Sequence, residues 1–201
     1  MSTAVISRRG PRTPPVERPV ISNTQLAMVA VIVGELMMFA GLIGGYLVFR
    51  LRTTEWPPEG LPRLPVALTA LNTLVLVASV VPMRAALAHV RANRIGEAGR
   101  AATLAAGLGG VFVAIQGFEW SRLVRHGLTL GSGGYGGAFY VLIGCHAVHV
   151  LIAIAFVAAV AVLVRRGRLD AERHTPLEMC ATYWYFVVAL WLGLFPLVYL
   201  Y

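Results

Sequence analysis

The chain has 201 residues, of which 58% are hydrophobic and only 13% are charged. Soluble globular domains carry about 25% charged residues, so the composition excludes a soluble domain and predicts an integral membrane protein. The net charge of +8 comes with no lysine, and the arginines stand at the ends of apolar segments and in short connections. This placement excludes a nucleic-acid-binding patch and is typical of membrane topology signals beside anionic lipid headgroups.

In chain order, the proline- and arginine-rich residues 1–23 predict a disordered cytoplasmic tail, and residues 24–201 predict a five-helix membrane domain. The fold class is therefore all-α. Five apolar segments are long enough to cross a hydrocarbon core of about 30 Å as helices. They lie at about 25–49, 66–88, 101–124, 138–164 and 178–200.

The distribution of arginine predicts the orientation of this bundle. Twelve arginines lie in the tail and in the second and fourth connections, against five in the flanks on the other side. The positive-inside rule then places the N-terminus in the cytoplasm and the C-terminus outside.

The connections and one helix carry further packing signals. Residues 53–65 contain four prolines and predict a stiff cap, whereas residues 127–137 contain six glycines and predict a pliable connection. In the first segment, Gly41 and Gly45 form a GxxxG spacing, which allows another helix to approach closely.

Four ionisable residues lie inside the apolar segments: Glu35, Glu119, His146 and His149. A carboxyl group at the bilayer centre costs at least about 2.5 kcal/mol, so it needs a partner or a proton. Counting residues from the segment ends places Glu35 and His149 at similar depths, and Glu119 and His146 both nearer the outer face. We therefore expect Glu35 to interact with His149, and Glu119 with His146.

Several roles fit these residues. They can be neutral or mutually hydrogen-bonded groups that fix helix register, together with the interhelical hydrogen-bonding candidates Asn72, Thr73, Ser79 and Gln116. A proton relay through Glu35 or Glu119 is the second reading, because intramembrane acids recur in proton paths. A metal site on Glu119 with the two histidines is the third, although no second Glu-x-x-His helix is present.

The sequence offers no other site. It contains no Ser/His/Asp set, no Walker loop and no dinucleotide fingerprint. We therefore predict no catalytic residue, no cofactor-binding residue and no metal ligand in this chain.

Ordered blocks along the chain resemble subunit III of the haem-copper oxidases, in its five-helix bacterial form. They read GELMMFAGLIGGYLVFR at 34–50, WPP at 56–58, LNTLVLVAS at 71–79, QGFEW at 116–120, YGGAFYVLIGCHAVHV at 135–150 and TYWYFVVALWLGLFPLVYL at 182–200. In that family, the membrane-embedded glutamate of the first block corresponds to Glu35, the glutamate of the fourth to Glu119, and the H-x-x-H block to His146 and His149.

The resemblance implies a non-redox subunit of a respiratory terminal oxidase in the bacterial plasma membrane, whose donor is cytochrome c or quinol. Such a subunit packs beside subunit I, which holds the haems and copper, in a complex with subunit II. It binds phospholipid, stabilises the catalytic subunit during turnover and supports proton uptake during oxygen reduction.

The chain also departs from the family pattern. Gly34 replaces the usual serine before the first glutamate, and Tyr185 and Val188 stand where the last helix usually has histidine and aspartate. The same five-helix build resembles the accessory membrane protein of nitric oxide reductases, so that reading stays open. An autonomous proton or ion carrier using Glu35 and Glu119 is the remaining alternative, against which the lack of inverted repeats weighs.

Overall fold

The computed structural model describes residues 22–201, so the expected tail, apart from its last two residues, lies outside the described residues. Within this range the chain forms α1 (Asn23–Arg52), α2 (Val66–Ala78), α3 (Val80–Arg91), α4 (Ile95–Arg125), α5 (Gly133–Arg165), α6 (Thr175–Phe195) and the short π-helix η1 (Pro196–Leu200). These elements make five spans long and apolar enough to cross a membrane, at 23–52, 66–91, 95–125, 133–165 and 175–200. The prediction of an all-α bundle of five membrane spans is confirmed.

The first helix begins at a capping box. Ser22 Oγ accepts a hydrogen bond from the backbone N–H of Gln25 at 3.2 Å, and Gln25 Oε1 accepts from the backbone N–H of Ser22 at 3.0 Å. Two of the N–H groups that a helix start leaves unpaired are thereby satisfied. The helix ends where the Thr53 hydroxyl donates to the carbonyl of Phe49 at 3.1 Å.

The second span is broken into α2 and α3 at Ser79, a feature that the sequence analysis missed. Pro82 cannot donate to the carbonyl of residue 78, and its ring crowds that carbonyl. The hydroxyl of Ser79 turns back onto the carbonyl of Leu76 at 2.5 Å. The broken segment nevertheless continues in one direction and serves as a single span.

The glycine-rich connection is shorter and more ordered than expected. Helix α5 already begins at Gly133, so residues 133–137 are helical rather than pliable. Ser132 Oγ donates to the carbonyl of Gly127 and accepts from the backbone N–H of Thr129, each at 2.8 Å. A β-carbon on Gly136 would overlap the carbonyl of Thr129, so this glycine allows the turn to fold against its own helix.

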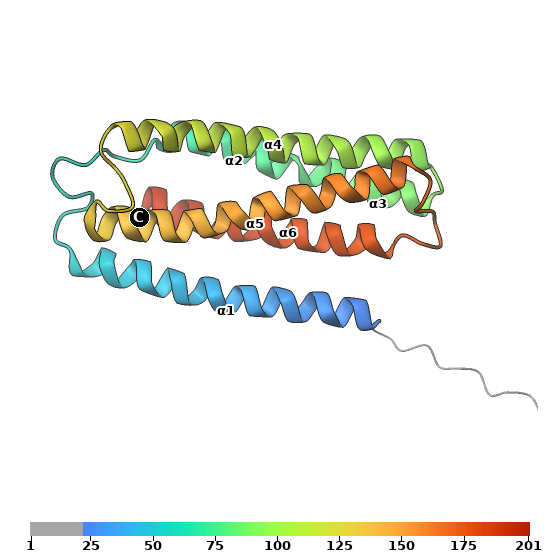
Figure 1. Ribbon diagram of the computed structural model, residues 1–201, viewed down its shortest axis with the longest axis horizontal. Helices are drawn as coiled ribbons and strands as arrows, with labels where there is room; N and C mark the ends of the chain where they lie inside the picture. Colours follow the sequence, from blue (N-terminus) through green and yellow to red (C-terminus); the bar gives the residue numbers. More distant parts are fainter. Residues whose placement is uncertain (1–21) are drawn as a thin grey trace, which may run out of the picture.

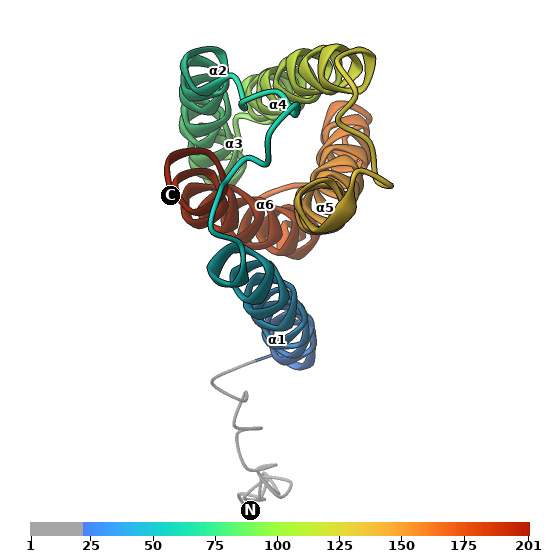
Figure 2. The same cartoon turned by 90° about the vertical axis from the view of Figure 1, so that its left-hand side faces the viewer.

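The long helices run roughly parallel to one another, with two connections at each end of the bundle (Figure 1). The 53–65 connection and the turn between α4 and α5 lie at one end, which we call the proline-loop side. Seen from that end, the α2–α3 span, α4, α5 and α6 surround a common centre, while α1 lies outside them against α5 and α6 (Figure 2).

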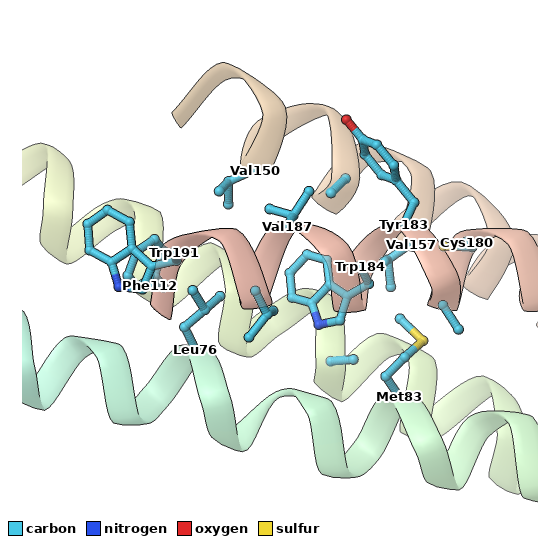
Figure 3. Close-up of a cluster of buried hydrophobic side chains, with 14 of the residues drawn as sticks. Leu76, Met83, Phe112, Val150, Val157, Cys180, Tyr183, Trp184, Val187 and Trp191 are labelled. Atoms are coloured by element: carbon cyan, nitrogen blue, oxygen red, sulfur yellow. The ribbon is translucent and has the colours of Figure 1, made fainter. Parts of the chain in front are cut away.

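The core of the bundle is built around two tryptophans of α6 (Figure 3). Trp184 and Trp191 are buried and face Leu76, Met83 and Phe112 from the neighbouring spans. The indole N–H of Trp184 donates to Ser79 Oγ at 3.0 Å. The break in the second span thus presents a side-chain acceptor to a buried donor that would otherwise remain unpaired.

Helix α1 is attached to the bundle by few side chains. Of its 30 residues only Phe39 and Tyr46 are buried. The spacing of Gly41 and Gly45 allows a helix to approach closely, and within the described residues a β-carbon on either glycine would meet nothing within 4 Å. The two glycines instead line a groove of about 190 Å³ against Gly137 and Ala138 of α5. Small residues on both walls leave this space open, while the buried rings of Phe39 and Tyr46 attach α1 to the bundle.

Candidate functional site

Glu35 lies where α1 meets α5 and α6. The hydroxyl of Tyr183 donates to Glu35 Oε1 at 3.1 Å, and the same oxygen lies 3.9 Å from His149 Nε2. The expected proximity of Glu35 and His149 is confirmed. Three side chains from three helices therefore meet at one carboxyl oxygen, and we call this group the Glu35 cluster.

The hydrogen bonding of His149 shows how this cluster can hold a proton. His149 Nδ1 lies 2.7 Å from the carbonyl oxygen of Cys145, and because a carbonyl only accepts, Nδ1 carries a hydrogen. The other ring nitrogen, Nε2, is the one that faces Glu35. A neutral acid beside a neutral imidazole and a carboxylate beside an imidazolium are the two arrangements of this pair that carry one shared proton and no net charge.

Glu119 lies near the proline-loop end of α4 and is 2% exposed. Thr69 Oγ1 donates to Glu119 Oε2 at 2.9 Å, whereas Glu119 Oε1 has no hydrogen-bond partner within the described residues. One turn earlier on α4, the Gln116 amide donates to the hydroxyl of Tyr199 at 3.0 Å. Glu119 is thus held in a buried polar group between α2, α4 and η1.

His146 does not form the expected pair with Glu119. Its ring stacks on Trp191, with centroids 5.2 Å apart and planes at 22°, and neither ring nitrogen has a hydrogen-bond partner among residues 22–201. The depth estimate ignored helix rotation, which turns His146 toward α6 and Glu119 toward α2. Phe39 lies edge-on to both imidazoles, at 6.2 Å from His146 and 5.2 Å from His149.

The expected interhelical hydrogen bonds are present. Asn72 Nδ2 donates to the carbonyl of Phe112 at 2.9 Å and joins α2 to α4. Trp191 Nε1 donates to Thr73 Oγ1 at 2.9 Å and joins α6 to α2. Together with the bonds of Ser79 and Gln116, these links fix the rotation of each helix about its axis.

Sequence reasoning missed the partners Tyr183, Thr69, Tyr199 and Trp191. Buried threonine and tryptophan inside apolar spans resemble ordinary core residues, so they gave no separate signal. Tyr183, Trp191 and Tyr199 do lie in the last sequence block. Their roles as hydrogen-bonding or stacking partners still depend on how the helices face one another, which the block does not state. Cys145 and Cys180 are free, and no three His, Cys, Asp or Glu side chains between residues 22 and 201 gather as metal ligands would.

The geometry defines a class of protein: a polytopic α-helical membrane protein whose buried acids are embedded in helix contacts. A family model described as cytochrome c oxidase subunit III matches residues 9–201. The chain belongs to the cytochrome c oxidase subunit III family.

Relatives that are themselves called cytochrome c oxidase subunit 3 come from distant organisms. One from Thermostichus vulcanus is 31% identical over 176 residues, covering 87% of this chain and 86% of the relative. One from Synechocystis is 33% identical, covering 86% of this chain and 73% of the relative. One from the vertebrate Scyliorhinus canicula is 32% identical over 95% of this chain and 73% of its own length. The chain is therefore a multi-pass bacterial membrane protein and a subunit III of a haem-copper oxidase, a family that carries no redox centres of its own.

Proposed function

We propose that this chain stabilises the catalytic subunit of its oxidase and supports proton uptake through the Glu35 cluster. The observation that carries the proposal is the meeting of Glu35, Tyr183 and His149 at one carboxyl oxygen. Two titratable groups that share one proton can exchange it between them without a change in net charge, and the Tyr183 hydroxyl can stabilise the Glu35 carboxylate that remains when the proton is passed on.

We further propose that subunits I and II of the oxidase are its partners, with the haems and copper in the catalytic partner. Helix α1 supports this arrangement because its outer face is apolar and exposed, as at Leu36 and Met37. The groove at Gly41 and Gly45 has an apolar lining that suits a phospholipid chain. The arginine count supports a cytoplasmic N-terminus, which would put the proline-loop side outside.

The test is Glu35→Gln in the whole oxidase, with Glu55→Gln as the matched control because Glu55 is an exposed acid in the 53–65 connection. The amide keeps the shape of the side chain and can still accept from Tyr183, but it cannot release a proton. We expect normal assembly, judged by the haem spectrum, with lower oxygen consumption or faster inactivation during turnover. Unchanged assembly together with unchanged turnover would reduce Glu35 to a packing group.

The sequence left two alternatives that the same preparation separates. Copurification of the tagged chain with b-type haem and non-haem iron would favour the accessory protein of a nitric oxide reductase. Purification without any haem-bearing subunit, combined with proton flux in vesicles that hold the chain alone, would favour an autonomous carrier. The proposal requires a haem-copper subunit in the eluate and no turnover by this polypeptide alone.

A further inference from the structure

A cavity of about 210 Å³ leads from the surface on the proline-loop side to Glu119. Its rim includes the exposed side chains of Arg63, Arg122 and His126, and Glu119 forms part of its wall. The cavity has room for several water molecules, and its polar lining gives them partners. Glu119 lies six residues before the end of α4 at Arg125, so only about 9 Å of helix separates it from that end.

The hydrogen bonds of Glu119 fit both of its protonation states. Thr69 Oγ1 lies 2.9 Å from Glu119 Oε2 and 2.8 Å from the carbonyl of Pro65, but its single hydrogen can serve only one of them. When Glu119 is ionised, Thr69 donates to it. When Glu119 is protonated at Oε2, the acid donates to Thr69, and Thr69 donates to Pro65. A proton can therefore come and go while this chain of hydrogen bonds stays complete.

The charges around Glu119 come from three elements. Arg122 lies one turn further along α4, Arg63 lies in the connection before α2, and His126 follows the end of α4. The hydroxyl of Tyr199, on η1, carries no charge and already accepts a hydrogen bond from the Gln116 amide. Both arginines line the same cavity as Glu119, so they add positive charge to the surroundings of its carboxyl group. Glu119 Oε1 is buried and has no hydrogen-bond partner within the described residues, so one acceptor position of the carboxyl group is unfilled.

Toward the centre of the bundle, aromatic rings separate Glu119 from the Glu35 cluster. Trp191 lies between Phe112 and His146, with ring centroids 5.2 Å from each. Phe39 follows between the two histidines. Among residues 22–201, no chain of hydrogen bonds passes through these rings from Glu119 to the Glu35 cluster.

From these observations we propose that Glu119 exchanges its proton with the solution on the proline-loop side, through the cavity bounded by Arg63, Arg122 and His126. The two acids then have separate roles: Glu119 is a water-linked acid on one side of the membrane, and the half-buried Glu35 belongs to the membrane interior. This inference is independent of the proposed role of Glu35, because its test measures access to Glu119 and not oxidase turnover.

The first test labels the intact oxidase in sealed membrane vesicles of either orientation with a membrane-impermeant cationic carbodiimide and an amine. The carboxyl group adds to the carbodiimide, and the amine then displaces the urea to leave an amide whose mass identifies the residue. The exposed acids Glu55 and Glu59 report the proline-loop side, and Glu172 reports the opposite side. We expect Glu119 to be labelled in the same vesicles as Glu55, more slowly than that exposed acid because Glu119 is 2% exposed.

The second test replaces the acid by a thiol, which covers the case in which the carbodiimide is too bulky for the cavity. Glu119→Cys, in a background of Cys145→Ser and Cys180→Ala, should react with a small ammonium methanethiosulfonate added on the proline-loop side. Glu55→Cys in the same background is the matched control. If this variant fails to assemble, the labelling of the native chain decides alone. Silence of Glu119 in the assembled proteins while position 55 reacts to completion, or labelling together with Glu172, would overturn the proposal.

Discussion

Replacing Gly109 by alanine is the sharpest test of how the bundle is packed. Gly109 lies on α4 against the indole of Trp184. A β-carbon at this position would overlap the indole Cη2 and would lie 3.1 Å from Ile154 Cγ1. The indole has no room to retreat, because Trp184 is 0% exposed and its N–H is bonded to Ser79 at 3.0 Å. We expect Gly109→Ala to destabilise the fold.

The magnitude follows from two contributions. Overpacking a filled core costs about 1–3 kcal/mol. Displacing the indole far enough to weaken its hydrogen bond adds about 0.5–1.5 kcal/mol. Alanine also gains up to about 1 kcal/mol over glycine in a helix, which reduces the net loss.

Gly110→Ala is the matched control, because a β-carbon at this neighbouring position meets nothing within 4 Å. Both variants share the gain in helix propensity, so their difference isolates the clash. At about 2–4 °C per kcal/mol for a chain of this size, Gly109→Ala should melt several degrees below Gly110→Ala. The assay is the temperature at which this chain is lost from the purified complex. Equal midpoints for the two variants would refute the packing of Trp184 on α4.

Two further substitutions test the hydrogen bonds of the buried acids. Tyr183→Phe removes the donor to Glu35 and keeps the ring, so we expect normal assembly with a partial loss of turnover in the direction of Glu35→Gln; turnover equal to wild type would show that this bond has no part in the role of Glu35. Thr69→Val leaves Glu119 without its donor and should lower stability by about 1–3 kcal/mol, whereas Thr69→Ser should retain most of it. Thermal loss of the chain from the complex measures both Thr69 variants, and equal loss for valine and serine would contradict the assignment.

The five spans could be predicted because hydrophobic length is a local property of the sequence. The first residues of the helices, such as Asn23 and Gly133, were harder to predict. Polar or small side chains at these positions can belong to a helix or to the connection before it. The break at Ser79 had a signal in Pro82, which removes one backbone donor and crowds one carbonyl.

The candidate site could be predicted only in part. The sequence indicates how deep a residue lies in the membrane, but not how its helix is rotated about its own axis. Depth follows from counting residues, and this brought Glu35 and His149 together correctly. The direction in which a side chain leaves its helix depends on how that helix packs, and this is why Glu119 met Thr69 instead of His146. Small residues have the same ambiguity, since Gly41 and Gly45 permit a close contact without requiring one.

The loose seating of α1 has a consequence for how the complex communicates with Glu35. The carboxyl group stands on α1, whereas Tyr183 and His149 stand on the four-span bundle, so the cluster bridges a seam. Widening this seam by about 1 Å would break the 3.1 Å bond from Tyr183. The docking of α1 and the contacts of Glu35 are therefore coupled, and the coupling free energy between them is the same in both directions. A subunit or lipid that contacts α1 can therefore change the contacts of Glu35 without touching Glu35 itself.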